Sequence, residues 1–170
     1  MKSVMFVCTA NRCRSPMAEA LFRALVKERG ESAEWWTESA GVGAIEGEPA
    51  TENTQQVASE RGMNLGTHRS KPATWATLEP FSLVLVMEEN HRRQLREAAP
   101  ELADRVYMLS EMVGLGSDVW DPIGREIEKY RAMADEIDGM LRTGFDRIGE
   151  LADYPPSPPA KDRARSPTSE

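Results

Sequence analysis

Short strand-like runs alternate along this chain with longer segments in which an apolar residue recurs every three or four positions. The short runs predict β-strands at residues 4–7, 36–40, 83–87 and 106–109, and the third is apolar throughout, as in a strand buried on both faces. The helical periodicity predicts helices at residues 16–28, 50–60, 90–98 and 125–151. Strands that alternate with helices are typical of an α/β protein with a parallel sheet.

The length and the composition fit one domain. A chain of 170 residues is long enough for one well-buried core and too short for two ordinary domains. We therefore expect a single α/β domain over residues 1–152, with a four-stranded parallel sheet flanked by helices in a flavodoxin-like three-layer sandwich. Gly41, Gly43 and Gly47 predict a flexible loop after the second strand. Residues 153–170 are rich in Pro, Ser and charge, which predicts a disordered tail, with a proline-rich ligand for a partner as the alternative.

The first strand leads into the segment CTANRCRS, residues 8–15, which places a cysteine, five residues, an arginine and a serine before the first helix. The free N–H groups at the start of that helix would face an anion in the loop. Thiolate is the reactive form of cysteine, and oriented amides, the helix N-terminus and Arg14 all favour negative charge on Cys8. Cys8 alone would fit a buried structural cysteine. Asn11, Arg12 and Arg14 on the same turn argue instead for an anion-binding catalytic loop.

The other side chains of this loop suit a phosphoryl group. Arg14 presents a planar fork of donors for two phosphoryl oxygens. Ser15 can cap the helix through its hydroxyl and donate a hydrogen bond to the thiolate, and Pro16 fits the first helical position. We therefore expect the phosphate to be bound by Thr9, Ala10, Asn11, Arg12, Cys13, Arg14 and Ser15.

The chain contains two cysteines, Cys8 and Cys13, which does not match a secreted disulfide framework. Cys13 has two interpretations: it traps an oxidised Cys8 as a reversible disulfide, or it packs beneath the loop. A zinc site of Cys8, Cys13, His68 and His91 is a third hypothesis, which the lack of a CxxC pair or closely spaced histidines disfavours. We expect neither a metal nor another cofactor.

The net charge of −7 argues against nucleic acid and acidic membranes as partners. No apolar run approaches the roughly 20 residues of a membrane span, and the apolar start is interrupted too early for a signal peptide. We expect a cytoplasmic protein, a monomer or a weak dimer, whose partner is a phosphorylated protein or a small phosphomonoester.

The segment VMFVCTANRCRSPMAE, residues 4–19, resembles the N-terminal signature of the low-molecular-weight protein tyrosine phosphatase family nearly residue for residue. Further matches follow in the family's order at Ser39-Ala40-Gly41, at His68, at residues 83–87 and at Asp121-Pro122. The resemblance covers about residues 1–151 and implies a metal-independent, cysteine-dependent phosphatase.

The resemblance also implies a mechanism. Cys8 attacks phosphorus while Arg14 and the loop amides hold the equatorial oxygens, and a cysteinyl-phosphate forms. Asp121 followed by Pro122 is alone a weak turn signal, but after the fourth strand it is a candidate for the acid that protonates the leaving oxygen. The ionised Asp121 then draws a proton from the water that releases phosphate.

The family pattern implies a hydrogen-bond network beneath the loop, formed here by Asn11, Ser39 and His68. Asn11 suits this place because asparagine tolerates left-handed backbone better than most residues. His91 follows two glutamates and an asparagine, and we expect it to be an exposed helix residue.

The substrate is less defined by the pattern. Tyrosine-specific members carry aromatic residues around the pocket mouth, whereas this chain has Ile45 in the glycine loop and Ile123 after the Asp-Pro. The Asp-Pro-x-Gly form resembles bacterial members that include phosphoarginine phosphatases. Those carry threonine where this chain has Arg12, and a cation there is expected to repel a guanidinium leaving group. Trp120 is a candidate for the missing aromatic wall. We expect a protein tyrosine phosphatase, with a protein arginine phosphatase as the alternative.

Two rival functions come from other classes. Thioredoxin-coupled arsenate reductases share this fold and loop but relay oxidation through later cysteines, and this chain has none after Cys13. A non-catalytic phosphoprotein-binding module needs neither the thiol nor the acid, and this chain has both.

Overall fold

The computed structural model describes residues 1–153, so the predicted tail at 153–170 lies outside the described residues except for its first member. The sheet consists of four parallel strands in the order β2-β1-β3-β4. The strands are β1 Lys2–Cys8, β2 Trp35–Gly41, β3 Leu83–Val86 and β4 Val106–Met108. The predicted fold class is confirmed, and each strand lies within two residues of its predicted place.

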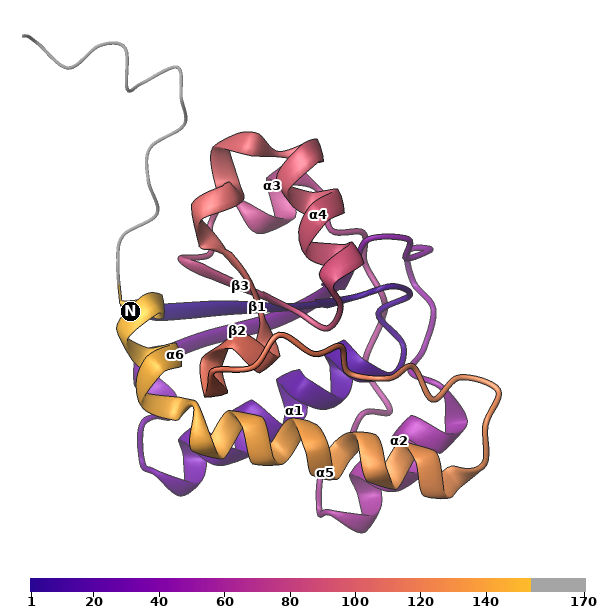
Figure 1. The fold of residues 1–170 in the computed structure, drawn as a ribbon. Coiled ribbons are helices and arrows are strands. Elements are labelled where there is room, and N and C mark those ends of the chain that lie inside the picture. The colour runs from indigo at the N-terminus through magenta and orange to yellow at the C-terminus, as the bar shows by residue number, and fades with distance from the viewer. Residues whose placement is uncertain (154–170) are drawn as a thin grey trace, which may run out of the picture.

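Helices cover both faces of the sheet and give the molecule three layers (Figure 1). They are α1 Arg14–Glu28, α2 Glu52–Glu60, α3 Trp75–Leu78, α4 Glu89–Ala98, α5 Ile127–Thr143 and α6 Phe145–Ala152. Figure 1 shows α3 and α4 on one face, and α1, α5 and α6 with the more distant α2 on the other. Three short 3₁₀ helices complete the chain: η1 Ser32–Glu34, η2 Pro100–Arg105 and η3 Leu109–Val113. The sequence pattern did not predict α3 or these short helices.

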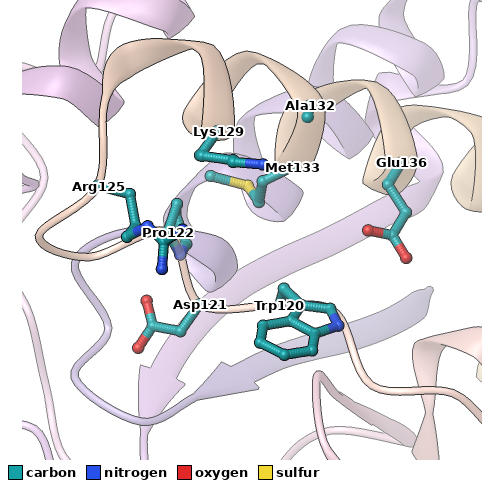
Figure 2. A pocket seen from close by; sticks show the side chains of 8 residues that line it. All are labelled: Trp120, Asp121, Pro122, Arg125, Lys129, Ala132, Met133 and Glu136. Carbon is teal, nitrogen blue, oxygen red and sulfur yellow. The ribbon is translucent and has the colours of Figure 1, made fainter.

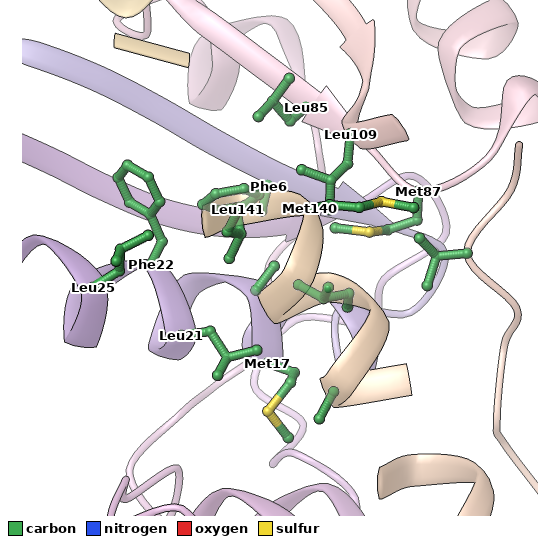
Figure 3. Packing of buried hydrophobic residues seen from close by; sticks show 14 of the residues in the cluster. Phe6, Met17, Leu21, Phe22, Leu25, Leu85, Met87, Leu109, Met140 and Leu141 are labelled. Atoms are coloured by element: carbon green, nitrogen blue, oxygen red, sulfur yellow. The ribbon is translucent and has the colours of Figure 1, made fainter. Parts of the chain in front are cut away.

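Alternate side chains of the two central strands enter two separate hydrophobic clusters, because successive strand residues point to opposite faces. Val4, Phe6, Leu83 and Leu85 belong to the cluster with α1, α5 and α6, whereas Met5, Val7, Val84 and Val86 pack toward α4. Figure 3 shows the larger cluster between β1 and α1. Both faces of the central strands are buried, which explains their continuously apolar sequence.

The predicted helix at 125–151 is wrong as one element, since the structure divides it into α5 and α6 at Gly144. A Cβ atom at Gly144 would lie 2.8 Å from Met112 Cβ and 2.9 Å from Met140 O. Only glycine permits this close approach of η3, and the bend lets α6 contact β1 and β3. Within residues 1–153, no helix is both long and apolar enough to cross a membrane.

Candidate active site

The candidate site is built on residues 8–15, which connect the carboxyl end of β1 to the start of α1. The carbonyl oxygens of this loop are held by the surrounding chain. Val42 N donates to Cys8 O at 2.9 Å, Gly43 N to Thr9 O at 2.9 Å, and Thr51 N to Arg12 O at 3.0 Å. His68 Nε2 lies 2.7 Å from Asn11 O.

These outward carbonyls fix the direction of the neighbouring amides. In a trans peptide, the N–H of one residue points opposite to the C=O of the residue before it, and the described chain has no cis peptide. The N–H groups of Thr9, Ala10, Arg12 and Cys13 are therefore directed toward the interior of the loop. Inward amides beside a helix N-terminus form an anion-binding concavity.

Asn11 holds the loop in shape from its centre. Its φ of 56° is the one positive value among the non-glycine residues described, so the backbone here is left-handed. Asn11 Nδ2 donates to Ser15 Oγ at 2.8 Å and to Ser39 Oγ at 3.0 Å, and Asn11 Oδ1 accepts from Lys71 N at 3.0 Å. Ser39 in turn donates to Glu19 Oε2 at 2.6 Å. The structure thus brings Asn11, Ser39 and His68 together, as the family pattern implies.

Cys8 is 2% exposed, and its Sγ lies 3.0 Å from Ser15 Oγ. The same hydroxyl lies 3.2 Å from Ala40 O. The prediction that Ser15 caps the helix is wrong. The helix starts one residue earlier, at Arg14, and Cys13 occupies the N-cap position without a side-chain cap. Ser15 therefore directs its hydroxyl into the loop rather than to the helix amides.

Arg14 is a buried cation, 2% exposed, whose guanidinium is surrounded by acceptors. Its Nη1 donates to Val119 O at 2.8 Å and lies 3.1 Å from Glu88 Oε2. Its Nη2 lies 3.4 Å from Thr9 Oγ1 and 3.5 Å from Asp121 Oδ2. Sequence reasoning missed Glu88, which follows β3 at the same edge of the sheet as Cys8.

The prediction that His91 is exposed is wrong, because its side chain is 1% exposed. Its Nε2 lies 2.8 Å from Thr9 Oγ1 and 2.9 Å from Glu88 Oε2. Burial lowers the pKa of His91, and the Arg14 cation lowers it further, although Glu88, Asp118 and Asp121 oppose this shift. The burial of His91 could not be predicted from its charged sequence neighbours, because it results only from the packing of α4 against the loop.

Asp121 reaches the site from the loop after η3. Its Oδ1 accepts a hydrogen bond from Ile123 N at 3.1 Å, which fixes the carboxylate over a tight turn. Its side chain is 39% exposed, so one oxygen faces Arg14 while the group stays open to solvent. Asp121 and Trp120 also line a cleft of about 420 Å³ against α5, with Arg125 and Lys129 on its opposite side (Figure 2).

Gly41 supports the loop from below. It is the last residue of β2 and pairs with Cys8, so the predicted flexible loop begins only after it. A Cβ atom at Gly41 would lie 2.5 Å from Thr9 O and 2.8 Å from Asn11 N, both backbone atoms of the loop. The sequence signal for this requirement was a glycine at the end of a strand, which is common to many turns.

The Cys13 side chain lies beside the start of α2. Its Sγ lies 3.5 Å from Thr51 Oγ1. Burial raises the pKa of the Cys13 thiol, and hydrogen bonds with the hydroxyls of Thr51 and Thr54 lower it by less. Both cysteines are free thiols. The four zinc candidates do not form a donor set, because within residues 1–153 no three side chains of His, Cys, Asp or Glu are arranged to hold a metal.

Arg12 lies at the rim of the loop, where its Nε donates to Pro49 O at 2.8 Å. This bond ties its guanidinium to the segment before α2. The large apolar side chains that the sequence places around the pocket mouth are exposed: Trp120 by 85%, Ile45 by 71% and Ile123 by 50%. The rim therefore combines one tethered cation with exposed apolar groups.

A buried cysteine, a ring of inward amides and a buried arginine at the carboxyl end of a parallel sheet define a class, the cysteine-dependent phosphatases with an α/β fold. Residues 3–151 match the family described as low molecular weight phosphotyrosine protein phosphatase, and the chain belongs to this family. It is accordingly a cysteine-dependent phosphatase.

Relatives of this chain are named for different substrates. The protein-arginine-phosphatase of Bacillus subtilis is 37% identical over 140 residues, which cover 82% of this chain and 91% of that protein. The low molecular weight protein tyrosine phosphatase of T. tengcongensis is 40% identical, with a TM-score of 0.81 over 86% of this chain and 99% of that one.

A third relative is a solved structure of the YwlE arginine phosphatase in which cysteine is replaced by serine and the active-site serine is phosphorylated. It is 34% identical, with a TM-score of 0.82 over 87% of this chain and 96% of that one.

Proposed function

We propose that residues 1–152 form a phosphatase domain that removes phosphate from proteins through a cysteinyl-phosphate on Cys8. The observation that carries this proposal is the position of Cys8 Sγ, 3.0 Å from Ser15 Oγ at the base of a loop whose amides face inward. The phosphorylated serine in the YwlE structure supports it, because that serine carries phosphate at an active site where cysteine was replaced.

The reaction takes place in two steps. The Cys8 thiolate forms the S–P bond as the ester P–O bond breaks, and Asp121 gives its proton to the leaving oxygen. The amides and the Arg14 guanidinium stabilise the charge that gathers on the equatorial oxygens. Water then attacks phosphorus, the S–P bond breaks, and Asp121 recovers a proton from that water. Phosphate leaves and the thiolate is restored.

The residues around the loop have supporting roles in this proposal. Ser15 donates a hydrogen bond to the thiolate, and Asn11, Ser39 and His68 hold the loop so that its amides stay directed inward. The 0% exposed Asn11 makes these bonds away from competing water. Cys13 stays a candidate partner for an oxidised Cys8, and both are free here.

Phosphotyrosine is the substrate that the rim of the site favours. Trp120, exposed by 85%, offers an aromatic surface beside Asp121 for a phenyl ring. The tethered guanidinium of Arg12 repels a second guanidinium, as in phosphoarginine, and attracts acidic residues of a substrate protein.

Phosphoarginine is the second candidate, and the observation that favours it is the 37% identity to a protein-arginine-phosphatase. The two substrates differ at the leaving atom, which is oxygen in phosphotyrosine and nitrogen in phosphoarginine. The same thiolate and acid serve both reactions, so the rim residues decide between them.

The tests use phosphate release without added metal. Wild type is expected to hydrolyse p-nitrophenyl phosphate, Cys8→Ser to be inactive, and Cys13→Ser to keep most of the rate. Turnover that survives Cys8→Ser would overturn the mechanism. Release from phosphotyrosyl and phosphoarginyl peptides then identifies the substrate, and Arg12→Thr is expected to shift the preference toward phosphoarginine.

The net charge of −7 and the two free thiols also support a cytoplasmic protein that acts without a nucleic-acid or membrane partner. We expect a monomer or a weak dimer, which light scattering coupled to size exclusion would measure.

A further inference from the structure

His91 connects the phosphate-binding loop to the carboxylate beside Arg14. Its Nε2 lies 2.8 Å from Thr9 Oγ1 and 2.9 Å from Glu88 Oε2. The same Glu88 oxygen lies 3.1 Å from Arg14 Nη1, and Arg14 Nη2 lies 3.4 Å from Thr9 Oγ1. His91 Nε2 therefore contacts both Glu88, which lies beside Arg14 Nη1, and Thr9, which lies beside Arg14 Nη2.

The second nitrogen of the ring determines the protonation state. His91 Nδ1 is buried and has no hydrogen-bond partner within residues 1–153. A protonated imidazole, or a neutral one with its proton on Nδ1, would leave a buried N–H donor unsatisfied, at a cost of about 1–3 kcal/mol. The ring is therefore neutral with its proton on Nε2, where both Thr9 Oγ1 and Glu88 Oε2 can accept it.

The charges around the ring agree with the neutral form. Arg14 from α1 opposes a positive charge on His91, whereas Glu88, Asp118 and Asp121 favour one, and burial against the loop opposes it most strongly. A neutral His91 does not compete with Arg14 for the charge of Glu88. It supplies a directed N–H and leaves the ion pair to the guanidinium.

We propose that His91 is a positioning residue for Arg14: its Nε2–H fixes Glu88 and Thr9, and these hold the guanidinium plane toward the phosphate. The inference rests on the proposed phosphatase function and adds to it a residue outside the loop and outside the family signature at residues 4–19. His91 contacts Thr9 and Glu88 rather than Cys8, so its effect passes through Arg14. A guanidinium that is already oriented loses less freedom when it binds two phosphoryl oxygens.

The test compares two replacements of the imidazole. In His91→Gln, the side-chain nitrogen is as many bonds from Cβ as Nε2 is, so the donor is kept. His91→Leu has a similar size and no donor. Calorimetry with inorganic phosphate measures anion binding without turnover, and kcat and KM for p-nitrophenyl phosphate measure the reaction.

His91→Leu is expected to weaken phosphate binding about tenfold and to lower kcat/KM by at least that factor, a loss of about 1.4 kcal/mol. His91→Gln is expected to stay within about threefold of wild type in both. Arg93→Gln on the exposed side of α4 is the control and should match wild type. Wild-type phosphate affinity in His91→Leu, or equal losses in the Leu and Gln variants, would overturn the inference.

A second pair of variants, at Thr9, tests the inference if the His91→Leu protein does not fold. Thr9→Val removes the hydroxyl and should weaken phosphate binding severalfold, whereas Thr9→Ser should keep it, and unchanged binding in Thr9→Val overturns the inference. Wild type that binds phosphate without hydrolysing p-nitrophenyl phosphate would instead overturn the proposed function alone.

Discussion

The hydroxyl of Ser15 lies 3.0 Å from the sulfur of Cys8 and also accepts a hydrogen bond from Asn11 Nδ2 at 2.8 Å. Because the Ser15 oxygen already accepts a hydrogen bond from Asn11, its own proton can be donated either to Cys8 or to Ala40 O, which lies 3.2 Å away. A thiolate is the stronger acceptor, so the Ser15 hydroxyl donates its hydrogen bond to ionised Cys8. The relationship joins the nucleophile to the network under the loop.

Ser15→Ala is expected to lower kcat about tenfold to a hundredfold, because the thiolate loses a charge-assisted hydrogen bond of about 1.5–3 kcal/mol. The alkylation rate of Cys8 by iodoacetate at neutral pH should fall as well. Stopped-flow turnover and mass-resolved alkylation measure these two effects. Unchanged rates in a folded Ser15→Ala protein would show that the Ser15 hydroxyl donates to Ala40 O rather than to Cys8.

Asp121→Asn is expected to lose about 10²–10⁴-fold in kcat when the leaving group is poor. Phenolate needs a proton more than p-nitrophenolate does, so phenyl phosphate should lose more rate than p-nitrophenyl phosphate. Parallel assays of both esters measure this dependence. Equal losses for the two esters would contradict a role for Asp121 as the acid and leave its contact with Arg14 as the explanation.

Gly41→Ala is expected to reduce activity more than tenfold and to destabilise the fold by about 1–3 kcal/mol, because its Cβ meets loop backbone at 2.5 Å. Gly43→Ala is the matched control, since its nearest contacts lie at 3.8 Å. Urea unfolding and p-nitrophenyl phosphate turnover measure the two effects. A Gly41→Ala protein as active as Gly43→Ala would show that the loop tolerates displacement.

Replacements of Asn11 separate its backbone from its side chain. Both Asn11→Gly and Asn11→Ala remove the bonds to Ser15, Ser39 and Lys71, and only alanine adds strain at a φ of 56°. The Asn11→Ala protein is therefore expected to be about 1 kcal/mol less stable than the Asn11→Gly protein, and both should be inactive or slow. Chemical unfolding gives the difference. Equal stability of the two variants would exclude backbone strain at this position.

His91 predicts a dependence of stability on pH. Burial lowers its pKa below the ordinary 6.5, so the unfolded chain binds the proton first as the pH falls. The contribution of neutral His91 to the free energy of unfolding is fully present above pH 6.5. It is lost as the pH falls below that value, by at most about 1.4 kcal/mol per pH unit. Urea unfolding between about pH 5 and 7.5 should show this loss in wild type but not in His91→Gln.

The pH window avoids two other shifted groups. Arg142 lowers the pKa of Glu28, and Arg131 lowers that of Glu60, so both titrate below their ordinary 4.5. Groups common to both proteins cancel in the difference between wild type and His91→Gln. Parallel curves for the two proteins across the window would contradict a neutral buried His91.

Periodicity predicted the four strands and most helices because buried strands and amphipathic helices leave local patterns. It failed at Gly144, where an apolar stripe continues through the sequence although the helix breaks against Met112. The cap predicted at Ser15 was also wrong; it came from the local preference for serine at a helix start. The structure uses that hydroxyl for Cys8 instead.

The sequence by itself determined the strands, the loop with Cys8 and Arg14, and the family of the enzyme, since strands and loop leave local patterns and the family's motifs follow one another in order along the chain. Only the tertiary structure decided the burial of His91, the contact of Glu88 with Arg14 and the need for Gly41 beneath the loop. These depend on segments far apart in sequence that meet at the carboxyl edge of one sheet. Their contact energies are absent from any local pattern, because chain packing alone creates them.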